Sequence, residues 1–429
     1  MRLRRPAHHL PVHPPPKFAG PIREDRATGV HIATLVAAAL TVVVGVQLIL
    51  PVLSLRRALL VSAPVASAEI ASTQTVPSLR SHARRDVRAI YLTSWSAATP
   101  GRLRDAIHLA QTTEVNGVVI DIKDYTGTVV FQTDNPLIGG LRADVPRLDL
   151  AALVDRLHSE GIYVIARIAA FQDQHLLKVK PYLAVRDPQG HIWSDRKGLG
   201  WVDPASPEVW EYLVEIGREA ARAGVDELNF DYIRFPSDGN LSELRYPVYE
   251  AARETKRQVI RRFFEYLTAQ LRPTGVMLSV DLFGLATVRP DDLGIGQIIE
   301  DAFLYFDYIS PMVYPSHYAL GFMSFANPAD HPYQVVRYSL VRAEQRRAAY
   351  ARMLATISAG IDAPAPLDRI AGIRPWLQAF DLGALYPPTV IRKQMEAVGL
   401  TAGWMLWNPS NRYQSATFEP EPSERTSSR

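Results

Sequence analysis

Eight short apolar segments, separated by helix-like stretches, constrain the fold of this chain more than any other feature. The segments are rich in β-branched and aromatic residues, which favour strands. They cover residues 87–93, 117–122, 163–168, 227–235, 276–283, 308–313, 370–377 and 403–407. Eight strands that alternate with helices are what a (β/α)8 barrel requires, so the predicted fold class is α/β with a TIM barrel.

The stretches between the predicted strands carry helix start and stop signals. Ser206, Pro207 and Glu208 supply an N-cap, a first-turn proline and an early acid before a helical apolar pattern at 210–223. The helical pattern at 148–160 ends at Gly161, directly before a strand. These signals support the alternation of helices and strands.

The N-terminal part of the chain predicts a membrane anchor. A basic, proline-rich head at 1–29 precedes residues 30–55, which are nearly all apolar and long enough for one transmembrane helix or signal anchor. The positive charges before this stretch place the head in the cytoplasm and the rest outside, as a single-pass protein of the cell membrane. The small residues at 65–68 leave open a cleaved signal peptide, in which case the protein is secreted.

Composition predicts the remaining domain boundaries. Residues 56–86 form a linker rich in Ala, Ser, Thr and Arg, residues 87–413 form the barrel, and residues 414–429 form a disordered tail with many polar residues and prolines. The chain has no cysteine, which excludes a disulfide framework and thiolate chemistry.

The charge distribution excludes a nucleic-acid partner. Of the 47 Lys and Arg and 44 Asp and Glu in the chain, residues 1–88 hold 12 basic and 4 acidic ones, leaving 35 against 40 for the remainder. A mildly acidic domain lacks the basic patch of a DNA- or RNA-binding protein.

Three carboxylates fall where the barrel strands end. The carboxyl ends of the strands converge in such a barrel, and catalytic residues lie there. Alternation along each strand directs Asp231, Asp281 and Asp121 inward. Glycoside hydrolysis needs one carboxyl as acid and another as nucleophile or base. We therefore predict Asp231 as the principal carboxylate, Asp281 on the adjacent strand as its partner, and Asp121 in reserve.

Aromatic, amide and charged residues at the same strand ends favour a carbohydrate ligand, because rings stack on sugar faces and polar groups bind hydroxyls. The predicted substrate-binding residues are Lys123, Asp124, Arg167, Asp173, Asn229, Arg234, Tyr314, His317, Trp376, Gln378, Trp407 and Asn408. Alternatively, Asp121 and Asp124 are strand-end caps, Lys123 and Arg234 only neutralise buried acids, and Trp201, Trp376 and Trp404 belong to the core. His317 has no second histidine at ligand spacing, so we predict no metal and no cofactor.

Seven ordered motifs between residues 88 and 413 resemble a family of TIM-barrel domains of unknown function that are classed as glycoside hydrolases. The motifs are 116–124, 165–168 with 171–173, 201–204, 226–236, 310–318, 373–378 and 407–408, and they include FDYIRFP, SPMVYPSHY and RPWLQ. The resemblance implies a sugar-cleaving barrel with Asp231 as the principal carboxylate. The chain departs from the family pattern at Ala379, where an acid is expected and the next one is Asp381.

The sequence thus predicts a membrane-tethered, extracytoplasmic glycosidase, a hydrolase of O-glycosyl bonds, whose substrate is a polysaccharide or oligosaccharide. Two alternatives stay open, because a fold does not determine a function. One is a non-catalytic carbohydrate-binding barrel, and the other is a scaffold for envelope proteins.

Overall fold

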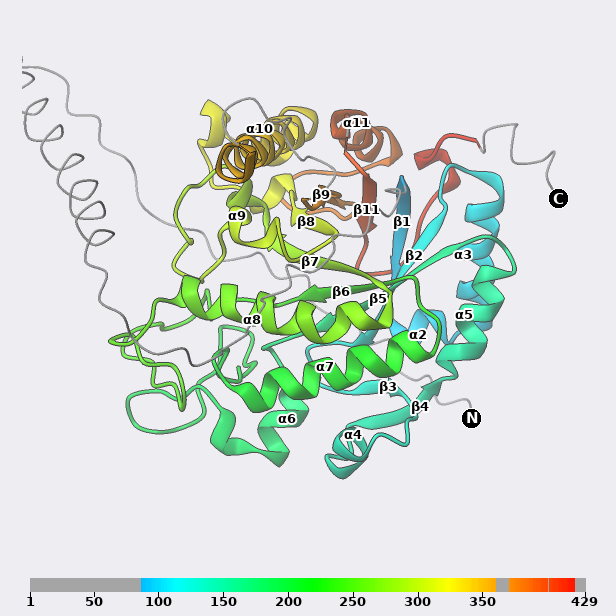
Figure 1. The fold of residues 1–429 in the computed structure, drawn as a ribbon. Helices are drawn as coiled ribbons and strands as arrows, with labels where there is room; N and C mark the ends of the chain where they lie inside the picture. Colours follow the sequence, from blue (N-terminus) through cyan, green and yellow to red (C-terminus); the bar gives the residue numbers. More distant parts are fainter. Residues whose placement is uncertain (1–85, 360–369, 400, 421–429) are drawn as a thin grey trace, which may run out of the picture. The chain divides into compact units, whose positions relative to one another are not determined.

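Parallel strands close into a barrel in the computed structural model, which describes residues 86–359, 370–399 and 401–420 (Figure 1). β1 pairs with both β2 and β11, so within these ranges the eight strand positions form a closed ring, consistent with a (β/α)8 TIM barrel. The ring consists of β1 (Val87–Leu92), β2 (Gly117–Lys123), β5 (Tyr163–Ala169), β6 (Glu227–Asp231), β7 (Met277–Phe283), β8 (Tyr308–Met312), β9 (Gly372–Ile373) with β10 (Trp376–Gln378), and β11 (Gly403–Trp407). All eight predicted segments contain a strand of this ring.

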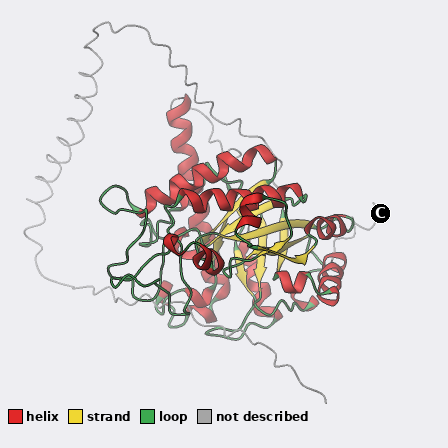
Figure 2. Ribbon diagram, turned by 90° about the horizontal axis from the view of Figure 1, so that it is seen from below, coloured by secondary structure: helices red, strands yellow, loops and turns green. Residues whose placement is uncertain are grey.

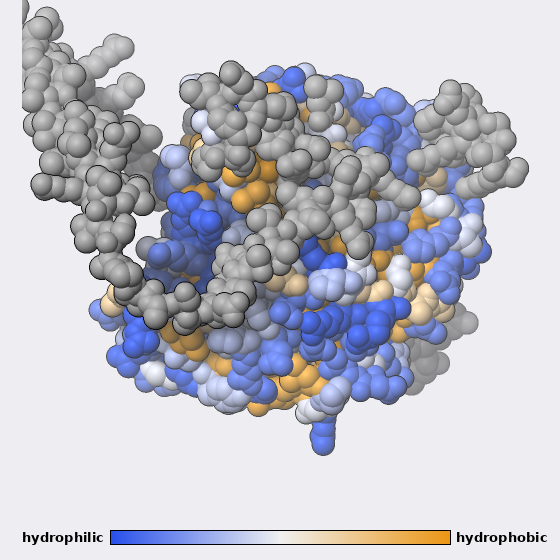
Figure 3. All heavy atoms as spheres, in the orientation of Figure 1, coloured by the Kyte–Doolittle hydropathy of each residue, from blue (hydrophilic) through white to orange (hydrophobic). Residues whose placement is uncertain are grey.

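Helices surround the strands, as Figures 1 and 2 show. The longer ones are α3 (Pro100–Thr112), α5 (Leu150–His158), α7 (Pro207–Arg222), α8 (Lys256–Leu271), α10 (Pro332–Ala359) and α11 (Pro388–Val398). Shorter helices are α2 (Ser94–Ala97), α4 (Pro136–Gly140), α6 (Gln174–Val179) and α9 (Ile299–Ala302), and 3-10 turns include η1 (Pro181–Leu183), η2 (Arg272–Thr274), η3 (Gly284–Thr287), η4 (Pro315–His317), η5 (Phe322–Ser324), η6 (Pro328–Asp330) and η8 (Ser415–Thr417). The face seen in Figure 3 is mainly hydrophilic with scattered apolar residues, as expected for the outer surface of such helices.

Local sequence explains where these helices begin. The Thr255 side chain accepts a hydrogen bond from Gln258 N at the start of α8, and the Gln258 side chain accepts one from Thr255 N, which forms a capping box. Asp149 caps α5 by accepting from Ala152 N at 3.0 Å. Ser206 precedes α7 as predicted but makes no side-chain cap bond, so Pro207 is the main start signal there.

The barrel divides its apolar residues between two cores. Tyr91, Val119, Ile165, Trp376 and Met405 belong to a small cluster contributed by alternate positions of the strands, which lies inside the ring. The larger cluster joins the other strand positions to the helices, for example through Ile120, Phe230 and Phe263. The small inner core leaves the carboxyl ends of the strands to polar side chains.

Two parts of the chain differ from the prediction within the barrel. An extra pair of strands, β3 (Val129–Phe131) and β4 (Asp144–Leu148), follows β2. These strands are short and β4 contains a proline, so neither gives a clear alternating pattern. The fourth predicted strand ends at Asp231 rather than at Phe235, because Tyr232 has a φ of +56° and turns the chain out of the sheet.

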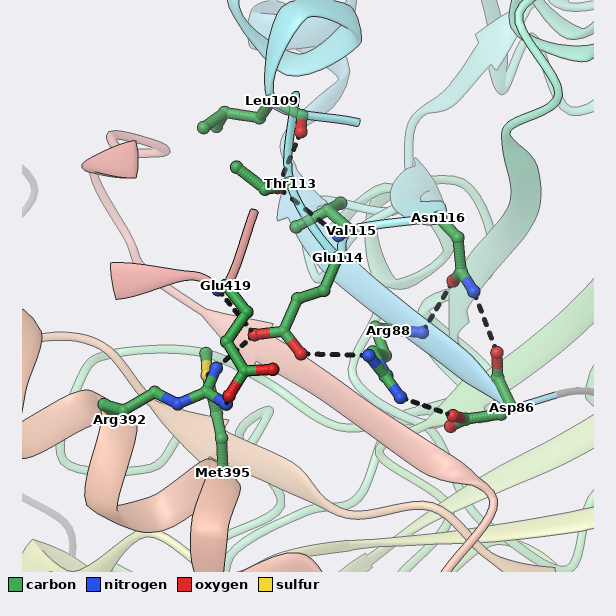
Figure 4. Close-up of polar contacts among 10 residues, drawn as sticks. All are labelled: Asp86, Arg88, Leu109, Thr113, Glu114, Val115, Asn116, Arg392, Met395 and Glu419. Carbon is green, nitrogen blue, oxygen red and sulfur yellow. Dashed lines mark hydrogen bonds and ion pairs between the residues drawn. The ribbon is translucent and has the colours of Figure 1, made fainter. Parts of the chain in front are cut away.

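The predicted disordered tail begins too early, because residues 414–420 pack on the barrel (Figure 4). Glu419 N donates to Glu114 Oε1 at 3.0 Å, and Glu114 N donates to Glu419 O at 2.9 Å. Arg392 from α11 forms ion pairs with both acids, and the buried Phe418 ring stacks on Trp404. One buried ring, two hydrogen bonds from backbone N–H groups and the ion pairs of Arg392 thus hold a segment whose composition is otherwise polar.

The predicted head at 1–29, the predicted transmembrane span at 30–55, nearly all of the linker at 56–86 and residues 421–429 lie outside the described residues. Within the described ranges, no helix combines the length and apolarity needed to cross a membrane.

Candidate active site

One guanidinium joins the three predicted carboxylates at the carboxyl ends of β2, β6 and β7. Arg167 on β5 places Nη1 2.6 Å from Asp121 Oδ1 and Nε 3.5 Å from Asp281 Oδ2, and its Nη2 contacts Asp231 Oδ2. The strand register explains the arrangement, because Asp121 pairs directly with Arg167, and Asp231 pairs with Ala169 two residues further along β5. The sequence placed these four side chains together at the carboxyl ends of the strands, and this geometry agrees with that placement. This end of the barrel is called the mouth below.

Asp281 is the most deeply buried of the three carboxylates. Its side chain is 1% exposed, and its Oδ1 accepts hydrogen bonds from Asn229 Nδ2 and Trp376 Nε1, both at 2.8 Å. Burial, together with the nearby charge of Asp231, raises the pKa of the Asp281 carboxyl to about 8. Its Oδ1 is therefore fixed by two donors, while its Oδ2 accepts a long bond from Arg167 Nε at 3.5 Å, so Oδ2 is the oxygen more able to carry a proton.

Asp121 has a phenolic neighbour that the sequence analysis missed. Tyr91 on β1 donates its hydroxyl to Asp121 Oδ2, and burial raises the pKa of the Asp121 carboxyl. Burial also raises the pKa of Tyr91 well above its ordinary value, so the hydroxyl stays protonated and remains a donor. The inward position of Tyr91, two residues after Ala89 on the same strand face, was a signal that could have identified it.

Asp231 has N–H donors at both carboxyl oxygens. Its Oδ1 accepts from Tyr232 N at 2.5 Å, and its Oδ2 contacts Arg167. The left-handed backbone of Tyr232 directs this amide back at the preceding carboxylate, and uncommon backbone conformations of this kind cluster at functional sites. These two donors fix the orientation of the Asp231 carboxyl group.

Aromatic rings form one side of the mouth. Tyr314 and Trp407 stack with ring centres 5.8 Å apart, and His317 meets the Tyr314 ring edge-on at 5.0 Å. Burial lowers the pKa of His317 to about 4, so this imidazole is neutral at ordinary pH. Phe380 packs against all three rings and was not among the predicted residues.

Arg234 lies on two further rings near Asp231. Its guanidinium carbon lies 4.6 Å from the centre of the Trp201 ring and 4.7 Å from that of Phe283. The alternative that Arg234 only neutralises a buried acid gains no support, since no carboxylate lies within 4.0 Å of it among the residues that the structure describes.

Lys123 and Asp173 lie in the wall of the barrel rather than in its mouth. Lys123 Nζ is 2.9 Å from Asp173 Oδ2, and both side chains are at most 1% exposed. The ammonium also donates to Ala169 O, while Asp173 caps α6 by accepting from Leu176 N. The alternation that directs Asp121 inward breaks between Asp121 and Lys123, where the pairing with β5 shifts register. These contacts favour a structural role, which was the alternative for Lys123.

Three other predicted substrate-binding residues brace the loops around the mouth. Asp124 accepts from Thr126 N, and Asn408 Oδ1 accepts from Ser410 N, so both close turns at 2.9 Å. Gln378 is buried and accepts from Ser316 Oγ at 2.9 Å. Asp381, the first acid after Ala379, accepts from Tyr386 N at 2.7 Å and belongs to the loop after β10.

The three aspartates of the cluster surround the guanidinium of Arg167. In the described ranges, no group of three or more His, Cys, Asp or Glu side chains is arranged to hold a metal ion. The three aspartates instead share the Arg167 guanidinium, which cannot neutralise three negative charges. A raised pKa at Asp281 and Asp121 is the expected consequence of this imbalance and of burial.

The fold is similar to that of one solved glycoside hydrolase domain, and two further solved structures match less closely. The glycoside hydrolase domain of PgaB (BpsB) from Bordetella bronchiseptica is 14% identical, with a TM-score of 0.52 over 78% of this chain and 99% of that one. A hypothetical protein from Ruminiclostridium thermocellum is 34% identical, with a TM-score of 0.41 over 48% of this chain and 98% of that one. The α-galactosidase TtGalA from Thermus thermophilus, solved with stachyose, is 15% identical, with a TM-score of 0.46 over 77% and 63%.

The family comparison covers nearly the whole barrel. No curated protein sequence matches the chain. A family model described as "Putative glycosyl hydrolase domain" matches residues 89–413, from β1 to the residue before the C-terminal segment. The chain therefore belongs to this glycosyl hydrolase family.

Proposed function

We propose that the barrel hydrolyses a glycosidic bond in a polysaccharide or oligosaccharide by a two-carboxylate mechanism. The observation that carries the proposal is the convergence of Asp121, Asp231 and Asp281 on Arg167, in surroundings that differ between the three carboxyls. Enzymes that cleave glycosides need one carboxyl that is protonated and one that is ionised at the same pH. Family membership and the glycoside hydrolase fold support this class of reaction.

The surroundings of the carboxyls suggest their roles. Asp231 ends β6 beside the left-handed turn at Tyr232, and N–H donors at both oxygens hold its carboxyl in a fixed orientation, which suits a nucleophile or base. Burial and the nearby charge of Asp231 raise the pKa of Asp281 to about 8, which suits a general acid that gives its proton to the leaving glycosidic oxygen. Asp121, with a raised pKa and the Tyr91 hydroxyl at one oxygen, is the reserve for this acid.

Sugar binding is proposed for the aromatic side of the mouth. The stacked pair of Tyr314 and Trp407 presents apolar ring faces, and Trp407 is partly exposed. Such rings pack against the apolar faces of pyranoses. Asn229 and Trp376 act through Asp281, which they hold in place, so they are positioning residues.

The extracytoplasmic, membrane-anchored location is part of the proposal and rests on the sequence of residues 1–55. A protease-protection experiment on intact cells tests this location. Digestion of the barrel from outside, with the head protected, is the expected result, and protection of the barrel would contradict it.

The decisive experiment compares four forms of the full chain with a panel of bacterial and plant polysaccharides. The forms are the wild type, Asp231→Asn, Asp281→Asn and the control Asp105→Asn, which changes an exposed residue of α3. New reducing ends from the wild type and the control, with losses in the two site variants and unchanged unfolding temperatures, are expected.

A second candidate is a non-catalytic carbohydrate-binding barrel, because Arg167 engages all three carboxylates and leaves Asp281 almost unexposed. Binding of a polysaccharide that is retained by Asp231→Asn, without new reducing ends from the wild type, would favour this candidate. If the chain neither binds nor cleaves any glycan, the remaining interpretation is an envelope scaffold.

A further inference from the structure

Arg234 is a fixed cation at the proposed cleavage site. It follows Asp231 by three residues, and its guanidinium lies over the Phe283 ring. Phe283 is two residues beyond Asp281 on β7, so it lies on the same strand face and nearer to the carboxyl end. The guanidinium therefore lies beyond Asp281 toward the carboxyl end of β7, where the charge of Asp231 still acts on Arg234.

The guanidinium retains donors for a ligand. Its Nη1 donates to Ser237 Oγ at 2.7 Å and to Phe235 O at 3.3 Å, and both acceptors are uncharged. Two other guanidinium groups of the described barrel have carboxylate partners instead: the buried Arg374 pairs with Glu227, and the exposed Arg257 pairs with Asp301. Arg234 has five N–H donors in a planar fork, and the fork matches an oxyanion.

Desolvation makes this charge costly. Burial lowers the pKa of Arg234, and the acids Tyr232, Asp231, Asp238 and Asp195 oppose that shift only from beyond ion-pair distance. Stacking on Trp201 and Phe283 holds the side chain in place. A guanidinium that is held in place without a carboxylate partner is available to an anionic ligand.

A second arginine of the same kind is Arg147 on β4, which packs against the start of α2, just after the carboxyl end of β1. Arg147 places its guanidinium carbon 3.9 Å from the centre of the Trp95 ring and donates to Ser94 Oγ at 2.8 Å. No carboxylate lies within ion-pair distance of it in the part of the chain that the structure describes. Ser94 and Trp95 directly follow β1, and the Trp95 side chain is 66% exposed. The two arginines thus lie near different strands of the ring, Arg147 near β1 and Arg234 near β6 and β7.

We propose that the mouth binds an acidic polysaccharide, with Arg234 contacting the anionic group of a sugar beside the cleaved bond and Arg147 contacting a second one at the rim. This inference rests on the proposed function for the place of cleavage. The three aspartates repel a polyanion, and the two arginines offset that repulsion locally. Since the residues after 88 hold 35 basic against 40 acidic side chains, general charge attraction does not provide the preference.

The test measures binding in the full chain carrying Asp231→Asn, so that no turnover is needed. The ligands are polygalacturonate, alginate and hyaluronan, each compared with a form whose carboxyl groups have been reduced to alcohols. Chondroitin with and without sulfate distinguishes a carboxylate from a sulfate ester as the recognised oxyanion. We expect at least one acidic polymer to bind about tenfold more tightly than its reduced form, the effect of one charge-assisted hydrogen bond.

Variants identify the residue responsible. Arg234→Gln is expected to remove the preference, Arg234→Lys to retain part of it, and the control Arg156→Gln, an exposed residue of α5, to leave it unchanged. Arg147→Gln provides a second test that does not depend on the folding of the Arg234 variant, and it is expected to weaken only the acidic form.

The inference is overturned by equal binding of the two forms, by binding of neither, or by a preference that survives both arginine changes. Failure of the proposed function has a different signature. In that case the chain with Asp231 intact releases no reducing ends, while its preference for the acidic form persists.

Discussion

Arg167 Nη1 lies 2.6 Å from Asp121 Oδ1, and the two residues face each other directly in the pairing of β2 with β5. The same guanidinium reaches Asp231 and Asp281 on the next two strands of the ring. A single cation therefore sets the charge balance of every proposed catalytic carboxyl.

The first prediction concerns Arg167→Met. Without the shared cation, repulsion among the three carboxylates is no longer offset, so the ionised form of the cluster is disfavoured. We expect kcat/KM to fall by about 10²- to 10⁴-fold and its acidic limb to move to higher pH. The measurement is the pH profile of kcat/KM, with Arg156→Met as the control. Arg167→Lys should recover part of the rate, and a reduced rate with an unmoved pH profile would contradict the electrostatic role.

The second prediction concerns the pH dependence of stability. The Asp281 carboxyl has a folded-state pKa of about 8, against an ordinary value of 3.8. Between these values the folded chain keeps a proton that the unfolded chain has lost, so this contribution to stability falls as pH rises and is gone above about pH 8. Asp281→Asn removes the effect.

Thermal unfolding from pH 5 to pH 9 tests this linkage. The Tm of Asp281→Asn relative to the wild type should rise by at least about 3 °C between pH 5 and pH 8, then stay level. The exposed Asp105→Asn should show no such trend. A constant difference between Asp281→Asn and the wild type would mean that Asp281 is ionised throughout.

The third prediction distinguishes a structural role of Lys123 in the barrel wall from a substrate-binding role in the mouth. Lys123→Met leaves the Asp173 charge buried without its partner and should cost about 3–5 kcal/mol in urea unfolding. The double variant Lys123→Met with Asp173→Asn should recover most of that loss, because the asparagine oxygen can still cap α6. If Lys123 instead bound substrate, Lys123→Met would raise KM and leave the free energy of unfolding unchanged.

At Lys123 the alternation of side chains along the strand fails to predict the structure. Alternation predicted Asp121, Asp231 and Asp281 correctly as neighbours, because they lie on regularly paired strands. The irregular pairing after Asp121 was invisible in the sequence and puts Lys123 in the wall. Tyr91 and Phe380 were missed because an aromatic residue in a barrel strand or its loop is equally compatible with the core.

The fourth prediction tests barrel closure at Gly403. This residue has a φ of +91° and pairs with Val87, and an added Cβ would lie 2.0 Å from Val87 O. Gly403→Ala should therefore cost about 3 kcal/mol or more, since both the backbone conformation and the β1–β11 pairing are disturbed. Gly161→Ala is the matched control, because Gly161 has a φ of +71° but open space around it. It should cost only about 1–2 kcal/mol, and equal costs in urea unfolding would contradict the closure.

The fifth prediction concerns the C-terminal segment. Phe418 is 7% exposed and stacks on Trp404 with ring centres 6.0 Å apart, and Glu419 continues through backbone bonds to Glu114. Phe418→Ala should lower the free energy of unfolding by about 3–5 kcal/mol, the usual cost of deleting a buried phenylalanine ring. The exposed Gln414→Ala is the control and should be neutral. Truncation after Tyr413 removes the ring and the Glu419 bonds together, so it should cost at least as much as Phe418→Ala. Wild-type stability of the truncated chain would instead support the disordered tail that the sequence predicted for residues 414–429.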